Sequence, residues 1–418
     1  MLENINSVLC GLVLPFSIFS VGIFFLFKLR LFYLVHPVAS VKRIVGASGG
    51  FRPLCVALAG TLGVGNIVGV ASAIIMGGAG SVFWMLLSAF VAMSVKYAES
   101  YLSVKHRRGC VNNYYGGASY YISDAFTSKG KKTVFGGIFA ILCVLNSLST
   151  GNLVQINSVS GIFKSHALAF GALFALGILL IVSGGERRIQ AASSVLIPIL
   201  TICYIIISAH IIFKNFGEAR VAVSRIFTEA FSPESIGPGV FGFAMARAVR
   251  FGLSRGLLSN EAGCGTSTVA HASSSSDEIS QGCLGIFEVF WDTVVLCTLT
   301  ALVILIADID SSSALELALS SYGKFTGALG KGFIATSLTL FALATVCCQY
   351  YYGTKCLGFL SASAVSKILY SIIFFAVCIV SSIISSEIMW QISDFIIASL
   401  ALYNLVFLVV MSKEIKAP

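Results

Sequence analysis

The chain has 418 residues, of which 57% are hydrophobic and 11% are charged. Soluble domains carry about 25% charged residues, so this composition excludes a soluble globular protein and indicates a polytopic membrane protein. The formal net charge is +9 at pH 7. We interpret this charge as a signal of membrane topology and not as a nucleic-acid-binding surface, because the basic residues lie mostly between apolar segments.

The hydropathy pattern predicts eleven membrane crossings within a single all-α transmembrane domain over residues 1–418. A helix needs about 20 mostly apolar residues to cross a bilayer. The predicted crossings are 8–27, 54–76, 82–102, 134–163, 167–183, 189–213, 240–248, 282–306, 333–351, 368–384 and 389–410. The seventh is short, and less hydrophobic sequence extends it at both ends.

The distribution of lysine and arginine predicts the orientation in the cell membrane. Cytoplasmic loops carry an excess of these residues. If the N-terminus is outside, the inner segments hold most basic residues, such as Lys105, Arg107 and Arg108, whereas the outer segments hold Asp308 and Asp310. We therefore expect the N-terminus outside and the C-terminus in the cytoplasm.

The segment Gly60-Thr61-Leu62-Gly63-Val64-Gly65-Asn66 lies in the middle of the second predicted crossing. Each glycine costs a helix roughly 1 kcal/mol relative to alanine. Membrane helices are broken only where the freed backbone groups line a cavity or find partners in the protein. The segment therefore predicts a mid-depth binding site for a small solute or ion, with close helix packing as the alternative.

Glycine and proline also cluster in the seventh predicted crossing, at Gly237-Pro238-Gly239 and on to Phe243. If residues 1–30 form an extra leading helix, the two breaks fall in core helices one and six of ten. This spacing is typical of an inverted five-plus-five repeat that binds its solute between the broken helices. We expect the two repeats at 54–213 and 236–410.

A broken helix offers two kinds of polar backbone group to a ligand. The exposed N–H groups suit a carboxylate, and the exposed carbonyl groups suit a sodium ion or an ammonium group. An amino-acid zwitterion together with a cation would match both ends.

Several motifs occur in the same order as in one transporter family. They are the glycine-rich segment 58–71, Lys96-Tyr97-Ala98-Glu99, the segments 116–122 and 255–263, Asp292-Thr293 and Tyr350-Tyr351-Tyr352-Gly353. Together they span almost the whole chain, which resembles the sodium:alanine/glycine symporter family. The resemblance implies a LeuT-type fold with one extra leading helix, and sodium-coupled symport of a small neutral amino acid across the lipid bilayer.

The resemblance also implies the site residues. The implied substrate site comprises Gly63, Val64, Gly65, Gln155, Phe241, Phe243 and Gln349. The implied oxygen ligands of one Na⁺ ion come from Thr61, Asn66, Asp292 and Thr293, and those of a second from Ala59, Leu62 and Thr345. Sodium would be a co-transported ion and not a prosthetic group.

The chain departs from the family pattern at Val64 (threonine in the family), Ala344 (a hydroxyl residue), Gln349 (tryptophan) and Arg247 (an uncharged residue). These departures weaken the cases for alanine as substrate and for sodium coupling. The alternatives are an exchanger or a proton-coupled carrier of a more polar amino acid such as glutamine or serine, and a membrane sensor that does not transport. The sequence contains no P-loop and no nucleophile–base pair that would favour an ATP-driven pump or an enzyme.

Charged residues inside membrane spans are costly and therefore functional candidates. Asp292 is the strongest, because it lies mid-span beside Thr293. We expect Glu288 to have a structural role, paired with an arginine. Asn260 and Glu261 are expected to fix a cytoplasmic loop or gate without contacting substrate. None of the five histidines has a partner at a useful sequence spacing.

Overall fold

The computed structural model describes residues 5–6, 8–47, 49–110, 113–126, 132–231 and 238–418, with the backbone alone at 164, 238–246 and 386. The described residues form an almost entirely helical structure, so the predicted all-α membrane protein is confirmed. Eight stretches of described helix are long and apolar enough to cross a membrane. The other three predicted crossings correspond to a broken helix, a short helix of 16 residues and a 23-residue helix that begins at Pro238.

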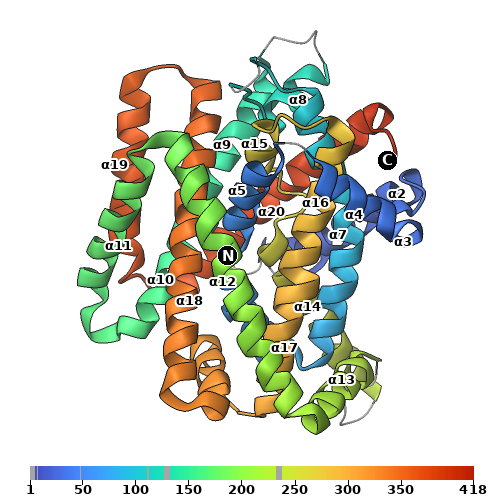
Figure 1. The fold of residues 1–418 in the computed structure, drawn as a ribbon, viewed down its shortest axis with the longest axis vertical. Helices are drawn as coiled ribbons and strands as arrows, with labels where there is room; N and C mark the ends of the chain where they lie inside the picture. Colours follow the sequence, from blue (N-terminus) through green and yellow to red (C-terminus); the bar gives the residue numbers. More distant parts are fainter. Residues whose placement is uncertain (1–4, 7, 48, 111–112, 127–131, 232–237) are drawn as a thin grey trace.

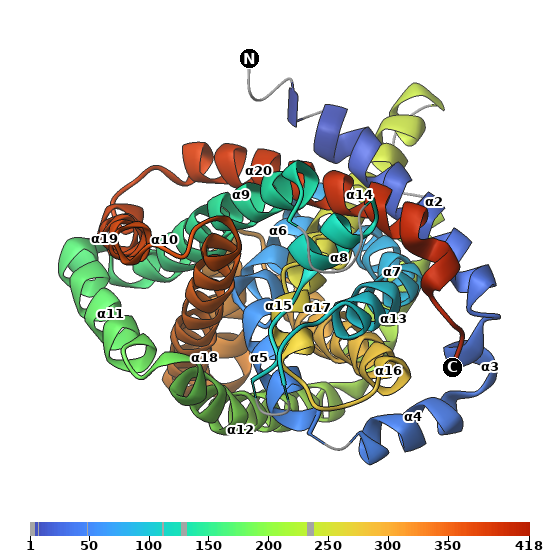
Figure 2. The ribbon, with the colours of Figure 1, turned by 90° about the horizontal axis from the view of Figure 1, so that it is seen from above.

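The leading segment forms one membrane helix followed by two short helices. Its elements are η1 (Leu9–Val13) and α2 (Leu14–Lys28), then α3 (Phe32–Val35) and α4 (Pro37–Gly46). Pro15 lies inside the continuous helix Leu9–Lys28, where the π-helical turn η1 passes into α2, so its missing N–H falls at a change in the hydrogen-bond pattern. Helix α2 packs against α7 and α20 at the edge of the helical core. In the view from above, α2, α3 and α4 lie at one edge of the molecule, opposite α11 and α19 (Figure 2).

The first five core helices follow in order. Core helix 1 is broken into α5 (Phe51–Thr61), the 3₁₀ turn η2 (Val64–Asn66) and α6 (Val68–Gly77). The next elements are α7 (Gly80–Lys105), α8 (Ala118–Asp124), α9 (Val134–Leu148), η3 (Ser149–Leu153), α10 (Val154–Ser160), η4 (Gly161–His166), α11 (Ala167–Val182) and α12 (Gly185–Lys214). Helix α8 lies at the upper end of the molecule in Figure 1.

The surface helix α13 (Phe216–Phe231) leads into the second set of core helices, and it lies at the lower end of the molecule in Figure 1. The second set comprises α14 (Pro238–Asn260), α15 (Thr268–Ala272), α16 (Glu278–Val289), η5 (Phe290–Cys297), α17 (Thr298–Ala307), α18 (Ala314–Leu360), α19 (Ala364–Ser381) and α20 (Ser386–Val410), followed by η6 (Met411–Glu414). Helix α18 has a kink at Gly327, where φ is 64°. Helices α7 and α16 pack against each other, as do α9 and α18.

The predicted break in core helix 1 is confirmed. Helix α5 ends at Thr61, Gly63 is extended, and α6 begins at Val68. The predicted position of the second break is wrong, because the backbone is helical from Pro238 to Asn260; Gly237 lies outside the described residues. Proline fits the first turn of a helix and here marks where α14 begins. Core helix 6 is broken instead between α14 and α15, at 261–267.

Three residues in this second break have left-handed backbone conformations. The φ angles are 47° at Glu261, 89° at Gly263 and 72° at Gly265. Glycine adopts such angles without steric penalty, whereas a residue with a Cβ does so only when its surroundings hold it there. The two Gly-x-Gly segments, at 63–65 and 263–265, thus occupy the breaks of the two core helices.

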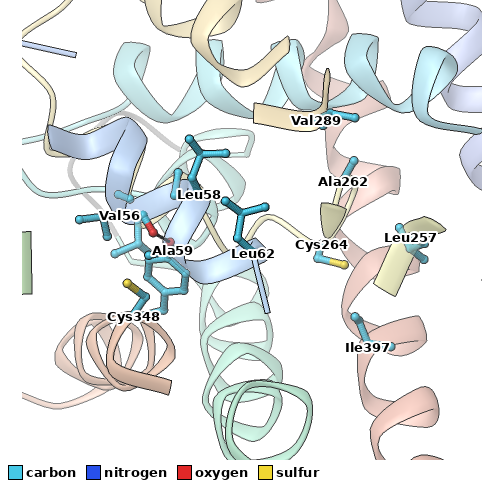
Figure 3. Close-up of a cluster of buried hydrophobic side chains, with 14 of the residues drawn as sticks. Val56, Leu58, Ala59, Leu62, Leu257, Ala262, Cys264, Val289, Cys348 and Ile397 are labelled. Carbon is cyan, nitrogen blue, oxygen red and sulfur yellow. Dashed lines mark hydrogen bonds between the residues drawn. The ribbon is translucent and has the colours of Figure 1, made fainter. Parts of the chain in front are cut away.

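Apolar side chains surround the first break. Figure 3 shows part of this buried cluster, which includes Val56 and Ala59 of α5, Leu62 just after it, and Cys348 of α18. Leu257, at the end of α14, and Cys264, in the second break, belong to the same cluster. The two breaks are therefore held in an apolar interior, where each polar backbone group needs a partner within the protein.

Candidate substrate and ion site

The first break exposes one backbone N–H to a side chain from core helix 3. The N–H of Gly63 donates to the carbonyl of Thr61 at 2.8 Å, so the helical hydrogen-bond pattern of α5 stops there. The next N–H, of Val64, donates to Oε1 of Gln155 at 3.0 Å. Gln155 thus lies against the break, as the resemblance implied. Its amide oxygen occupies a position from which a ligand oxygen would also accept this hydrogen bond.

Glycines allow this close approach. A Cβ on Gly63 would lie 2.5 Å from Oε1 of Gln155 and 3.0 Å from Oγ1 of Thr345. A Cβ on Gly65 would lie 3.3 Å from the Cα of Ser259 in α14. The first break is therefore in direct contact with core helices 3, 6 and 8.

One set of predicted sodium ligands is brought together at the end of α5. Oγ1 of Thr345, on α18, lies 3.2 Å from the carbonyl oxygen of Leu62 and donates at 3.0 Å to the carbonyl of Phe341. The carbonyl of Ala59 lies less than one turn earlier on α5, and the N–H of Gly63 bonds Thr61 instead of continuing the helix to Ala59. Hydroxyl and carbonyl oxygens are the ligand type that hard cations prefer.

A second set of predicted ligands meets around Asp292 in the π-helical segment η5. Nδ2 of Asn66 donates to Oδ1 of Asp292 at 2.7 Å and lies 3.1 Å from the carbonyl oxygen of Asp292. Oδ2 of Asp292 accepts hydrogen bonds from Ser259 at 2.6 Å and from Thr293 at 2.8 Å. The Asp292 side chain is fully buried. Oδ1 of Asn66 has no hydrogen-bond partner among the described residues, so one buried acceptor at this cluster is left unsatisfied.

Thr61 is not part of this cluster in the structure. Its hydroxyl bonds back to the carbonyls of Ala57 and Leu58 within α5, and its carbonyl accepts from the N–H of Gly63. The structure thus joins Asn66, Asp292 and Thr293 but gives Thr61 other partners.

Gln349 faces the second break. Its Nε2 donates to Oε1 of Glu261 at 3.1 Å, and its side chain lies against Gly151, where a Cβ would come within 2.5 Å of Cγ. Oε1 of Gln349 is buried and has no partner within the described part of the chain. Glu261 also accepts from the hydroxyl of Thr266. Glu261 is therefore an integral part of the second break, whereas the sequence had led us to expect it to fix a cytoplasmic loop or gate.

The side chains of Phe241 and Phe243 lie outside the described residues. Their backbone is in the first turns of α14, about five turns before the second break.

A buried polar network that sequence reasoning missed lies beside the second break. Nζ of Lys96, on α7, contacts Oε1 of Glu288 at 3.1 Å and donates to the carbonyl of Asn260 at 3.2 Å. Nε2 of His271 lies 2.8 Å from Oε2 of Glu288, and Gln281 contacts the other ring nitrogen. Glu288 therefore pairs with a lysine and a histidine rather than with an arginine. Lys96 and Glu288 are separated by 192 positions in the sequence, so local spacing gave no signal.

The structure contains an open cleft of about 750 Å³. Val68, at the start of α6, lines it together with Asn157, Ser160, Ser313 and Trp390. These residues lie at the ends of core helices 3, 9 and 10 and at the start of α18, opposite the end that carries α8 (Figure 1). At the α8 end, the Lys96–Glu288 pair is fully buried.

Comparison with known proteins agrees with this geometry. The model of the sodium:alanine symporter family matches residues 1–417. The sodium/alanine symporter AgcS of Methanococcus maripaludis is 30% identical over 99% of this chain and 94% of its own length. The "Probable sodium/glutamine symporter GlnT" of Bacillus subtilis is 30% identical over 98% of this chain and 87% of its own length. The solved structure of MhsT in complex with L-phenylalanine superimposes with a TM-score of 0.59 at 14% identity, covering 87% of this chain and 89% of that one.

The family match makes the chain a secondary transporter, and its fold is of the LeuT type. The chain is a multi-pass membrane protein that belongs to the sodium:alanine symporter family.

Proposed function

We propose that the protein takes up a small neutral amino acid together with sodium by alternating access. The observation that carries this proposal is the bond from the N–H of Val64 to Gln155 at the first break. A substrate carboxylate would accept from the same N–H and displace the amide oxygen of Gln155. The gain in charge-assisted hydrogen bonding favours a carboxylate over a neutral amide at this position.

Two clusters of oxygen atoms, one on each side of the Val64 N–H, support the binding of two sodium ions. Thr345 and the Leu62 carbonyl lie at the end of α5, and Asn66 and Asp292 lie at the far side of η2. With its single hydrogen donated to the carbonyl of Phe341, the Thr345 hydroxyl oxygen would be free to bind a cation beside the carbonyl of Leu62. We propose Ala59, Leu62 and Thr345 for one ion, and Asn66, Asp292 and Thr293 for the other.

The cleft supports the direction of access. It opens at the end that bears the loops around 161–167, 308–313 and 382–385, while the α8 end is closed by buried pairs. With the N-terminus outside, the cleft faces the cell exterior and the basic segment 105–108 faces the cytoplasm. Substrate would enter from the cleft, and opening of the α8 end would release it.

Gln349 favours a second candidate, in which the substrate has a polar side chain. Its buried Oε1 is free to accept from a hydroxyl or an amide, and alanine would leave it unpaired. Sites that hydrogen-bond a substrate group discriminate strongly against analogues that lack it. Serine or glutamine therefore competes with alanine in this candidate.

Uptake of labelled amino acids into proteoliposomes, with and without a sodium gradient, tests the proposed function. We expect sodium-stimulated uptake of at least one neutral amino acid, and competition by serine or glutamine at least equal to that by alanine. The Gln349→Trp variant should shift the preference toward alanine and glycine, because it replaces the amide by an apolar surface. The Gly151→Ala variant serves as a control for the position of the amide, because its new Cβ would displace the Gln349 side chain without removing its amide group. Binding of amino acids without uptake would indicate a sensor instead.

Thr345→Ala is expected to weaken the response to sodium while the substrate ranking stays unchanged. A contact to a charged group is worth about 1.5–3 kcal/mol, so the sodium concentration for half-maximal uptake should rise about tenfold or more. Thr345→Ser keeps the oxygen and should behave as the parent does. Identical sodium curves for the alanine variant and the parent would remove Thr345 from the ion site.

A further inference from the structure

We infer that Glu99, on α7, is a proton-carrying site at the second break. This inference rests on the proposed transport function and adds a coupling ion that neither sodium cluster supplies. Oε1 of Glu99 accepts from the N–H of Gly265 at 2.8 Å and from Nδ2 of Asn404 at 2.7 Å. Oε2 of the same carboxyl group is buried and has no partner among the residues that the structure describes.

The surroundings of Glu99 contain more negative than positive charge. Its side chain is 1% exposed, and three buried carboxyl groups in this region face a single ammonium group. The titratable groups near Glu99 are Lys96 on the same helix, Glu288 on α16, Glu261 and Cys264 in the second break, and Tyr121 on α8. Helix α20 contributes the neutral Asn404.

The partners of these groups single out Glu99. Glu288 pairs with the ammonium group of Lys96 and has His271 at hydrogen-bond distance, and both oxygen atoms of Glu261 accept hydrogen bonds from Gln349 or Thr266. Within the part of the chain that the structure describes, Oε1 is the oxygen of Glu99 that accepts hydrogen bonds, and Oε2 accepts none. A buried carboxylate with a bare oxygen is far costlier than a neutral acid at the same place, so burial favours the protonated group.

A proton fits this place better than a metal ion. Sodium needs several oxygen ligands, whereas Oε2 of Glu99 is the one oxygen of this side chain that its partners leave free. A proton needs one lone pair and no extra volume. Chains of buried Asp, Glu and His residues are the usual route for protons in pumps and transporters.

Protonation of Glu99 would be coupled to the shape of the transporter. Through Gly265 and Asn404 the carboxyl group joins core helix 2 to the second break and to core helix 10. Asn404 also bonds the carbonyl of Gly263 and the hydroxyl of Tyr121 on α8, at the closed end. A charged Glu99 strengthens both of its accepted hydrogen bonds, and a neutral one weakens them. Release of the Glu99 proton toward the α8 end would therefore accompany a change in the conformation of the second break.

The test uses Glu99→Gln, which keeps the shape of the side chain and an oxygen for Gly265 and Asn404 but cannot bind the proton. Purified full-length protein is placed in liposomes that contain a pH-sensitive dye. In the parent we expect amino-acid addition to acidify the interior. In Glu99→Gln this acidification should fall to the level of protein-free liposomes, while exchange of internal for external amino acid continues. Glu316→Gln, on the exposed start of α18, should behave as the parent does.

Infrared difference spectra between acidic and neutral pH provide a readout that does not depend on transport. The parent should show a protonated-carboxyl band that Glu99→Gln lacks and Glu316→Gln keeps. Amino-acid uptake by the parent without acidification, or a band unchanged in Glu99→Gln, would overturn the proton site. Failure of all proteins to take up any amino acid would instead contradict the proposed function, and the infrared comparison would still decide on Glu99.

Discussion

Replacing Gly63 by alanine is expected to weaken substrate binding strongly while the protein still folds. The new Cβ would lie 2.5 Å from Oε1 of Gln155, which is the mobile end of a side chain. Because Gln155 can move away, the protein still folds. The hydrogen bond from Val64 to Gln155 is then lost, and the new methyl group occupies the space where the substrate carboxylate would bind. We expect a decrease in uptake of about tenfold or more, as one buried polar contact to a charged substrate is worth about 1.5–3 kcal/mol.

Gly69→Ala is the matched control for this prediction. Gly69 lies on α6 a few residues after the same break, and a Cβ there would meet nothing within 4 Å. Alanine in a helix interior stabilises by roughly 1 kcal/mol relative to glycine. Uptake by Gly69→Ala should match the parent, and both variants should show similar thermal unfolding in detergent. Normal uptake by Gly63→Ala would mean that the substrate does not bind at the N–H of Val64.

Lys96→Met should destabilise the protein more than any other single loss of a lysine. The lysine is fully buried and is the partner of Glu288 at 3.1 Å. Removing one member of a buried ion pair leaves an uncompensated charge and costs about 3–5 kcal/mol. The free energy of unfolding in detergent, measured with denaturant, should fall by this amount.

Two further variants separate charge from packing. The double variant Lys96→Met with Glu288→Gln should recover part of the lost stability, because no charge is then left unpaired. Lys355→Met removes the lysine of a half-exposed pair with Glu186 at 2.7 Å, and exposed pairs contribute about 0–1 kcal/mol. Equal losses for Lys96→Met and Lys355→Met would mean that the buried pair is not what stabilises this region.

Features that depend on one short window of sequence were predictable. The break at 60–66 combines glycines with an apolar span, and Asp292 is a carboxyl group within such a span. Unsatisfied backbone groups and a charged side chain both cost free energy in lipid, and this cost can be recognised without knowing how the rest of the chain folds. The contacts of Asn66 with Asp292, and of Thr345 with Leu62, followed from the family resemblance and not from spacing.

The sequence predicted the wrong position for the second break, because proline and glycine occur both at the start of a helix and at a break within one. Pro238 and Gly239 mark the first turn of α14, whereas Gly263 and Gly265 supply the positive φ angles of the break. The Gly-x-Gly spacing shared with Gly63 and Gly65 was the available signal. Asn260 and Glu261 were instead expected to fix a cytoplasmic loop or gate.

Contacts between distant helices could not be predicted from one sequence. His271 meets Glu288 only because α15 and α16 both pack against α7, and Glu99 meets Gly265 only because core helix 6 is broken. The π-helical segments η3 and η5 also have no compositional signature. They shift the register of core helices 3 and 7 just where Gln155 and Asp292 face the first break.

The lengths of the two halves of core helix 1 bear on how the chain enters the bilayer during synthesis. Helices α5 and α6 have 11 and 10 residues, and neither can span the hydrocarbon alone. While lipid is the only neighbour, the segment satisfies its backbone best as one unbroken helix. The partners at the break come later: Gln155 is 91 residues beyond Val64, and Thr345 is 283 residues beyond Leu62. The helix therefore opens after its neighbours have been made, so a chain truncated before α18 would insert the segment without completing the site.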